Sequence, residues 1–215
     1  DMNITIIGAG NMGRGIGTRL AAGGHSVTFV DGTPETAEKT AADVRAAAKG
    51  GAQVRTASLG EVALGDVVVL AVWYGTNIEL VKQLGARLAG KVVVDIANPL
   101  NASFDGLATA PDSSSAEDVA KAAAAEVKVV KAFNTTFAGT LLAGQVAGQP
   151  LDVFIAGDDA AAKETVARLV KDGGMRPIDA GPLSRARQIE GMQFLHILVQ
   201  GTLGTNWVSA VKIIS

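Results

Sequence analysis

A glycine-rich hexapeptide near the start of the chain, Gly8-Ala9-Gly10-Asn11-Met12-Gly13, limits the possible folds more than any other feature. The β-branched run from Ile4 to Ile7 precedes it and predicts a buried strand. Apolar residues then recur at helical spacing as far as Leu20. In such a strand–turn–helix unit the first glycine permits a tight turn, the second lets backbone approach a ligand, and the third lets the helix pack on the strand. The free N–H groups of Asn11 and Met12 would face an anion, so the segment predicts a dinucleotide-binding turn.

Strand and helix patterns alternate along most of the remaining chain. Strands are expected at 27–30, 53–56, 67–72, 92–96, 127–132, 151–156 and 176–180, and helices at 35–48, 76–88, 116–125 and 160–171. From Ser184 onward the pattern is helical throughout. We therefore predict an α/β fold, a doubly wound Rossmann domain with a mostly parallel sheet over residues 1–182, followed by a small C-terminal helical segment over residues 183–215.

Composition excludes several classes of function. With 19 Lys and Arg against 21 Asp and Glu, the net charge of −2 offers no broad positive field, so nucleic acid is not expected as a partner. The chain has no cysteine and two histidines, and it lacks nucleophile-elbow and zinc-protease motifs, so no metal is predicted and no catalytic residue is assigned. No apolar run approaches the ~20 residues of a membrane span and no basic leader is evident, so a cytoplasmic protein is expected.

Asp31 is the acidic residue expected after a dinucleotide-binding turn. It follows the second predicted strand, where a carboxylate can accept a hydrogen bond from the ribose 2′-hydroxyl. A carboxylate there should repel a 2′-phosphate, so Asp31 favours NAD over NADP, with Gly32 and Thr33 beside the same ribose. A structural role for Asp31, as a cap of the next turn, is the alternative.

Residues that follow the later strands are candidates for the nicotinamide end of the site, because ligands of open α/β sheets bind beyond the carboxyl ends of strands. They are Val72, Trp73, Tyr74, Asn98, Pro99 and Asn134. Aromatic side chains form only 4% of the chain, so Trp73 and Tyr74 are candidates to wall a planar ring, the alternative being a hydrophobic cover on the sheet. Asn134 can orient a carboxamide or a substrate carbonyl, or serve as a turn residue.

Three further segments resemble a known family. They are Val130-Lys131-Ala132-Phe133-Asn134-Thr135, Gly157-Asp158-Asp159, and Asp179-Ala180-Gly181-Pro182-Leu183-Ser184 followed by Arg187. With the glycine turn, they resemble the coenzyme F420-dependent NADP oxidoreductases and related reductases, including the cytosolic domain of membrane ferric reductases. The resemblance implies hydride transfer between a nicotinamide and a small-molecule redox partner, a deazaflavin (F420), a flavin or a similar acceptor. It also implies NADP as cofactor, and members that use NADP carry a basic pair where this chain has Asp31-Gly32-Thr33.

Two other functions remain as alternatives. An imine reductase similar to pyrroline-5-carboxylate reductase would share the glycine turn but would need a longer helical region than residues 184–215. A non-catalytic NAD(H)-binding redox-sensing module would suit Asp31.

The stretch from Met192 to Ile214 carries more apolar surface than a terminal helix pair can hide, which predicts a homodimer through this region.

Overall fold

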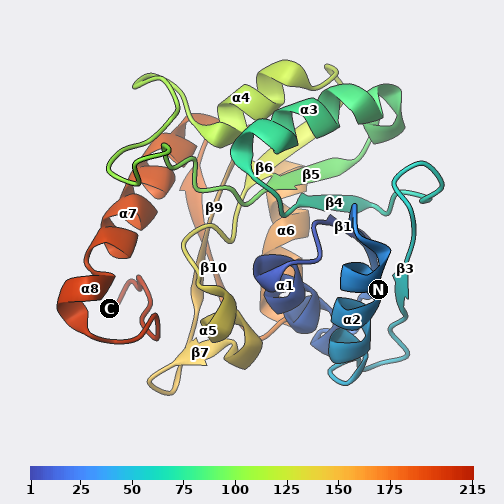
Figure 1. Ribbon diagram of the computed structural model, residues 1–215, viewed down its shortest axis with the longest axis horizontal. Coiled ribbons are helices and arrows are strands. Elements are labelled where there is room, and N and C mark those ends of the chain that lie inside the picture. The colour runs from blue at the N-terminus through green and yellow to red at the C-terminus, as the bar shows by residue number, and fades with distance from the viewer.

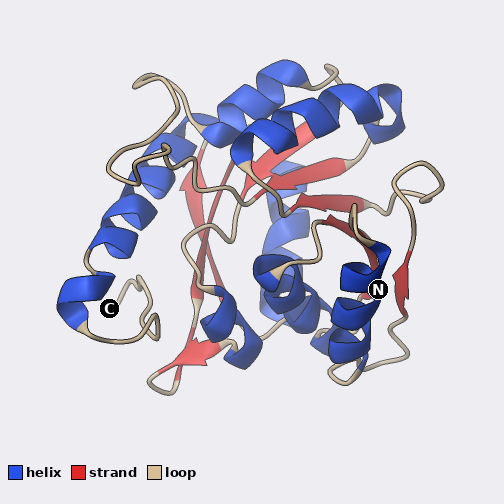
Figure 2. Cartoon of the chain, viewed as in Figure 1, coloured by secondary structure: helices blue, strands red, loops and turns tan.

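Eight strands form one central sheet in the computed structural model, which describes residues 1–215 (Figures 1 and 2). Their order is β10-β9-β6-β5-β4-β1-β2-β3. Their bounds are β1 Asn3–Ile7, β2 Ser26–Val30, β3 Val54–Thr56, β4 Val67–Leu70, β5 Val92–Asp95, β6 Lys128–Lys131, β9 Asp152–Gly157 and β10 Arg176–Gly181. Strands β1 to β6 run parallel, whereas β9 pairs antiparallel with β6 and parallel with β10. The predicted doubly wound, mostly parallel sheet is confirmed.

The helices connect these strands and cover both faces of the sheet. They are α1 Asn11–Ala22, α2 Pro34–Arg45, α3 Tyr74–Leu84, α4 Ser115–Ala122, α5 Ala138–Ala143, α6 Ala160–Asp172, α7 Ala186–Leu198 and α8 Gln200–Leu203, with 3-10 turns at Gly85–Leu88 and Leu183–Arg185. Helix α5 and the small hairpin formed by β7 (Gln145–Val146) and β8 (Gln149–Pro150) were not predicted. The expectation of helix from Ser184 to the end holds only as far as Leu203, because residues 204–215 form no helix or strand.

Alternation along the buried strands separates two hydrophobic layers. In β4, Val67 and Val69 join the core beneath α1, α2 and α6, whereas Val68 and Leu70 join the core beneath α3 and α4. All four side chains are buried, as expected for a parallel strand covered by helices on both faces. Helix α7 lies on the same face as α3 and α4, where its Ile189 packs against Phe154 of β9.

The chain changes direction across the sheet between β1 and β4. After β1 it adds β2 and β3 on one side, then returns to place β4 on the other side of β1. The turns that follow these two neighbouring strands therefore lead to opposite faces and leave a crevice at their carboxyl ends. The fold places Gly8 and Ala71 on either side of this crevice.

The segment after α8 is held against the sheet through one buried carboxylate. Asp152, the first residue of β9, accepts hydrogen bonds from the Lys212 ammonium at 2.8 Å and from the Ile213 N–H at 2.8 Å. Arg176 of β10 donates to both oxygens of the same carboxylate, at 2.7 and 2.6 Å. None of the helices has the length and apolar character needed to cross a bilayer.

Candidate dinucleotide-binding site

The turn between β1 and α1 presents free backbone donors at the crevice. Gly10 is the N-cap of α1, no side chain caps this end, and no acidic residue lies in the first turn. The first N–H groups of a helix have no intrahelical partner, and together with the helix dipole they favour an anion. A Cβ added at Gly10 would meet nothing within 4 Å, so the space in front of this turn is open to a ligand.

Gly8 and Gly13 are required for a different reason. Gly8 has φ +107°, and a Cβ there would lie 2.4 Å from the Ala71 carbonyl oxygen across the crevice. A Cβ at Gly13 would lie 2.0 Å from the carbonyl oxygen of Gly8. Both distances are too short for any side chain, so Gly8 and Gly13 allow the backbone of the turn to pack closely. Gly10, in contrast, faces open space.

Asp31 is attached to the same turn. One carboxylate oxygen accepts the Ala9 N–H at 2.9 Å and the other accepts the Thr33 N–H at 2.9 Å. The side chain is therefore held at the end of β2 with acceptor capacity left over, since each carboxylate oxygen can accept more than one hydrogen bond. Asp31 can therefore fix the turn through Ala9 and Thr33 and still accept a hydrogen bond from a ribose hydroxyl.

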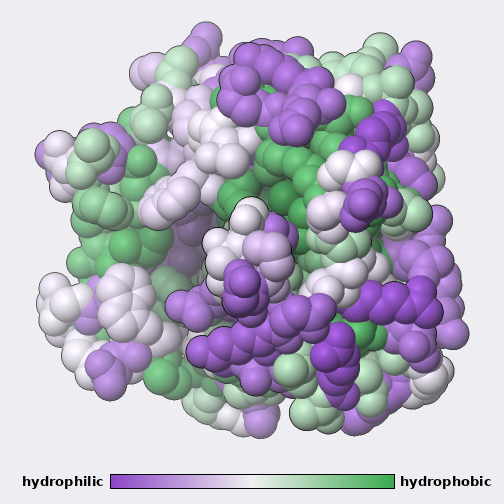
Figure 3. Space-filling model, turned by 45° about the vertical axis from the view of Figure 1, so that its right-hand side comes forward, coloured by the Kyte–Doolittle hydropathy of each residue, from purple (hydrophilic) through white to green (hydrophobic).

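A cavity of about 690 Å³ begins at the glycine turn. It is bounded by α2, by the segment after β3 and by the start of α3. Figure 3, which brings this side of the molecule forward, shows apolar surface recessed between hydrophilic rims. Gly8, Asp31, Gly32 and Val72 line it, as do residues that the sequence did not single out, namely Ile7, Val30, Pro34, Ala37, Glu38, Thr56, Ala57, Ser58, Leu59, Thr76 and Leu80. Two carboxylates and no basic side chain line this cavity. The other predicted site residues lie outside its lining: Gly10, Asn11, Met12, Gly13, Thr33, Trp73, Tyr74, Asn98, Pro99 and Asn134.

The two aromatic candidates at the end of β4 differ in orientation. Trp73 is 71% exposed at the N-cap of α3. Tyr74 is half-buried, and its hydroxyl donates to Asp118 of α4 at 2.7 Å. Burial and the bond to Asp118 raise the pKa of Tyr74 to about 12, so this phenol keeps its proton. Trp73 remains available to a ring, whereas the polar end of Tyr74 links α3 to α4.

Asn98 and Asn134 form a reciprocal amide pair between the loops after β5 and β6. The Asn98 amide donates to the Asn134 backbone carbonyl, and the Asn134 amide donates to the Asn98 side-chain oxygen, both at 3.1 Å. The side-chain oxygen of Asn134 is buried and has no partner. Pro99 is buried directly after Asn98. The structure thus brings together the residues predicted after β5 and β6, while Trp73 and Tyr74 follow β4, next to β5 in the sheet.

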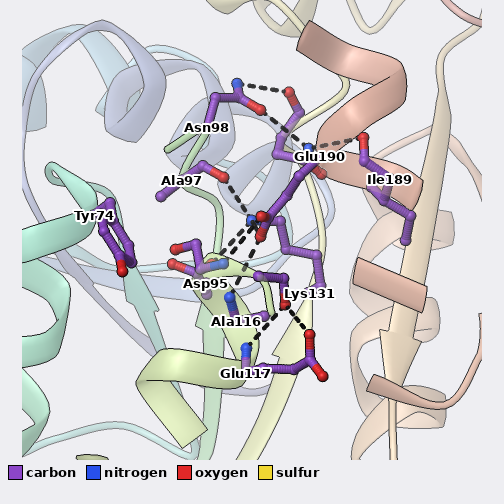
Figure 4. Close-up of polar contacts among 12 residues, drawn as sticks. Tyr74, Asp95, Ala97, Asn98, Ala116, Glu117, Lys131, Ile189 and Glu190 are labelled. Atoms are coloured by element: carbon purple, nitrogen blue, oxygen red, sulfur yellow. Dashed lines mark hydrogen bonds and ion pairs between the residues drawn. The ribbon is translucent and has the colours of Figure 1, made fainter. Parts of the chain in front are cut away.

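A buried charge cluster, formed by Asp95, Lys131 and Glu190, lies next to Ala97 and Asn98 (Figure 4). Asp95 and Lys131 end β5 and β6 and face each other in register, and Glu190 comes from α7. The Lys131 ammonium lies 2.9 Å from Asp95 and 2.8 Å from Glu190. The three side chains are 0%, 0% and 1% exposed. Burial alone would lower the pKa of Lys131, but the two carboxylates outweigh it and raise that pKa, so the lysine is charged.

Sequence reasoning missed this cluster. Lys131 lies inside a segment that carried the family resemblance, but no role was inferred for it. The available signal was a charged residue ending each of two apolar strands, Val92–Asp95 and Lys128–Lys131. Glu190 gave no comparable signal, because one acidic residue in a helix is usually exposed.

The doubly wound sheet, the crevice between β1 and β4, and the open glycine turn define the class of the protein: it has a Rossmann-type α/β fold.

Comparison with known proteins gives the family. The family model for the NADP oxidoreductases that depend on coenzyme F420 matches residues 3–99. An F420-dependent NADP reductase of Methanothermobacter thermautotrophicus is 30% identical over 88% of this chain and 85% of its own length. A solved structure of a candidate F420-dependent NADP reductase from Arthrobacter sp. FB24 covers 100% of both chains with 32% identity and a TM-score of 0.86.

Metalloreductase STEAP3 of Rattus norvegicus is also similar, at 33% identity over 88% of this chain. The matched region spans 36% of the length of that rat protein. The chain belongs to the family of coenzyme F420-dependent NADP oxidoreductases, and it is therefore a member of an oxidoreductase family. This finding confirms the resemblance inferred from the sequence segments.

Proposed function

We propose that the chain binds a nicotinamide dinucleotide across the crevice between β1 and β4 and takes part in hydride transfer with a second planar ring. The observation that carries this proposal is the open, uncapped start of α1 beside a cavity of about 690 Å³, with Asp31 attached to the same turn. The proposed binding residues are Gly8, Gly10, Asn11, Met12, Gly13, Asp31, Gly32, Thr33, Val72, Trp73, Tyr74, Asn98, Pro99 and Asn134. They come from the ends of β1, β2, β4, β5 and β6.

Each group has a distinct task in this proposal. The N–H groups at the start of α1 bind the pyrophosphate, and Asp31 accepts from the adenosine ribose. Trp73 lies against the nicotinamide ring, and the unpartnered oxygen of Asn134 accepts from its carboxamide. A reduced nicotinamide supplies the hydride, so the protein has to hold two rings in register and exclude water rather than move a proton.

The acceptor in this proposal is F420, a flavin or a similar ring. The names of the relatives in Methanothermobacter and Arthrobacter support F420. The high pKa of Tyr74 suits a reaction in which that phenol does not act as an acid.

The cofactor in this proposal is NAD(H) in preference to NADP(H). Asp31 and Glu38 are the charged side chains in the cavity lining, and both are acidic. A 2′-phosphate carries negative charge, and Asp31 forms no ion pair, so placing the phosphate beside this carboxylate is unfavourable. Glu38 lies 3.7 Å from the Arg45 guanidinium, which partly offsets its charge. The names of the relatives specify NADP, so on this point we expect the chain to differ from them.

Anaerobic stopped-flow oxidation of NADH and NADPH in the presence of F420 or FMN tests the proposed reaction. We expect NADH to be oxidised in the presence of one of the two rings, with NADPH reacting more slowly. Saturable NADH binding without oxidation by either ring would contradict the hydride-transfer proposal and favour a redox-sensing module.

We also propose that the chain forms a homodimer through residues 191–215 and acts in the cytoplasm. Residues 191–215 contain one Lys and no Arg, Asp or Glu, and this Lys212 is bound to Asp152. Large apolar side chains on this part of the chain are exposed: Leu195, Leu198, Leu203, Trp207, Val208, Ile213 and Ile214. An apolar surface of this kind supports an interface between two copies of the chain.

A further inference from the structure

The buried charge cluster is an expensive way to fill this part of the core. Removing three charged groups from water costs several kcal/mol each, and well-packed apolar residues of similar volume often give equal or greater stability. Stability alone therefore does not account for Asp95, Lys131 and Glu190 at 0–1% exposure. Charged hydrogen bonds differ from apolar contacts in being directional, so they fix the relative positions of the groups they join.

The cluster is connected by hydrogen bonds to the elements that carry Trp73, Asn98 and Asn134. The Lys131 ammonium also donates to the Ala97 carbonyl at 2.5 Å, directly before Asn98. Asp95 accepts at 2.8 Å from Asn77 in the first turn of α3, which begins after Trp73. The Asn134 amide reaches the Ile189 carbonyl at 3.4 Å, directly before Glu190. Hydrogen bonds thus connect the cluster directly to α3 and to the loop after β5, and connect the loop after β6 to Ile189, the residue before Glu190. Figure 4 shows Ala97, Asn98 and Ile189 around Lys131 and Glu190.

Glu190 also fixes the far end of the long loop between β5 and α4. Its two oxygens accept from the N–H groups of Ser115 at 3.0 Å and Ala116 at 3.4 Å, at the start of α4. Two carboxylates face one ammonium, and the positive end of the α4 dipole offsets the remaining negative charge. The loop that contains Asn98 and Pro99 is therefore held at both ends by the same three side chains.

We propose that Asp95, Lys131 and Glu190 are positioning residues, which set the arrangement of Trp73, Asn98 and Asn134 around the nicotinamide and so determine the rate of hydride transfer. This inference rests on the proposed function. It assigns these residues a role through Trp73, Asn98 and Asn134 rather than by contact with the cofactor. The glycine turn and Asp31 have no direct contact with the cluster, so binding of the adenosine half is independent of it.

The test is a neutral triple variant, Asp95→Asn/Lys131→Met/Glu190→Gln. It keeps acceptors for Asn77, Ser115 and Ala116 while removing all three charges and the ammonium bond to Ala97. Glu190→Gln alone serves if the triple variant does not fold, because it leaves Lys131 and Asp95 as a pair. Lys82→Met, on the exposed side of α3, is the control for loss of a surface ion pair.

Each variant is characterised by its melting temperature and by its dissociation constants for NADH and for ADP-ribose, which lacks the nicotinamide. The single-turnover rate of hydride transfer is measured with NADH and with 4-deuterated NADH. We expect the affinity for ADP-ribose and the melting temperature to stay near wild type while the affinity for NADH falls. We expect the transfer rate to fall about 10- to 100-fold, as for a small displacement of reacting groups. The isotope effect should rise because transfer itself becomes slower relative to other steps.

A folded variant with wild-type NADH affinity and transfer rate would overturn the positioning role. Equal losses of ADP-ribose and NADH affinity with a lower melting temperature would also overturn it, since they would indicate a purely structural cluster. If wild type binds NADH but transfers hydride to neither F420 nor FMN, the proposed reaction fails. In that case the comparison of NADH with ADP-ribose still decides the positioning role.

Discussion

Three glycines of one turn have separate physical tasks. Gly8 and Gly13 lack side chains because backbone atoms lie where a Cβ would be, whereas Gly10 faces open space. The sequence pattern predicted these tasks from spacing alone, because the turn is local and its geometry depends on consecutive residues. Substitution at each position should therefore affect either the fold or the ligand.

Gly10→Ala should weaken NADH binding by at least about tenfold while leaving the melting temperature unchanged, because the added methyl meets the pyrophosphate and no protein atom. Gly13→Ala should lower the free energy of unfolding by about 1–3 kcal/mol as well, because its methyl meets the Gly8 carbonyl. Fluorescence titration and thermal unfolding check both, with Gly201→Ala on α8 as control. Unchanged NADH affinity in Gly10→Ala would contradict the assignment of this turn.

Charge at the ribose position determines the expected cofactor preference. Asp31→Ser/Gly32→Arg removes a carboxylate and adds a cation beside the cavity, so we expect the preference for NADH over NADPH to reverse, with NADPH affinity rising about 10- to 100-fold. Asp31→Asn is the control that removes the charge and keeps one of the two hydrogen bonds to Ala9 and Thr33, because its amide oxygen can still accept. It shows whether the cofactor preference depends on the charge or on these bonds. Equal affinity of wild type for the two cofactors would refute the preference.

Asp31 and the glycine turn could be predicted from the sequence, but the buried charge cluster could not. Asp95 and Lys131 are 36 positions apart, and Glu190 lies a further 59 positions away. Their contact depends on the register of β5 with β6 and on the placement of α7 against them, which no local pattern encodes. Glu38 was missed for a related reason, because it lines the cavity only once α2 packs beside β3.

At the scale of elements, long buried strands and amphipathic helices were predictable, and short or irregular elements were not. Helix α5 has six residues and follows a polar turn, so it offers less than two turns of periodicity. Residues 204–215 have an apolar pattern that predicted helix, but Asn206 and Trp207 have positive φ and Lys212 and Ile213 bond to Asp152. Tertiary contacts therefore override local preference there.

Asp152→Asn should release the C-terminal segment and lower the free energy of unfolding by about 1–3 kcal/mol, since it weakens several charged hydrogen bonds. Chemical denaturation at neutral pH checks this, and limited proteolysis should cut the variant near residues 204–215. Glu79→Gln, which removes a surface ion pair, should change stability by less than about 0.5 kcal/mol. Equal resistance of Asp152→Asn and wild type would contradict the anchoring role.

The same carboxylate predicts a dependence of stability on pH. Burial alone would raise the pKa of Asp152, but hydrogen bonds from Arg176, Lys212 and the Ile213 N–H outweigh it and lower that pKa from 3.8 to about 2. A depressed pKa means that the contribution is present above 3.8 and is lost as the pH falls toward 2. The stability difference between wild type and Asp152→Asn should therefore shrink over this interval. A constant difference there would contradict the prediction.

For the whole molecule, the class of fold followed from the alternation of strands and helices, but the full topology did not. The reversal of direction at β9 is invisible in a sequence, because parallel and antiparallel strands of this length have the same burial pattern. Placement of the crevice between β1 and β4 likewise required the observed strand order.

The exposed apolar surface of residues 191–215 predicts a dimer in solution. Leu195→Asp/Val208→Asp should give a monomer because it introduces charges on two side chains that are 62% and 61% exposed. Sedimentation velocity at micromolar concentration measures this, with Lys82→Asp as a charge-changing control. A monomeric wild type would eliminate the proposed interface.

Fluorescence titration of the wild-type protein with NADH tests the central claim, that the turn from Gly8 to Gly13 binds a dinucleotide, most directly. We predict saturable binding with one site per chain and competition by ADP-ribose, with NADH binding at least about tenfold weaker in Gly10→Ala and no loss of fold. Absence of saturable binding, or binding that Gly10→Ala leaves intact, would contradict the claim.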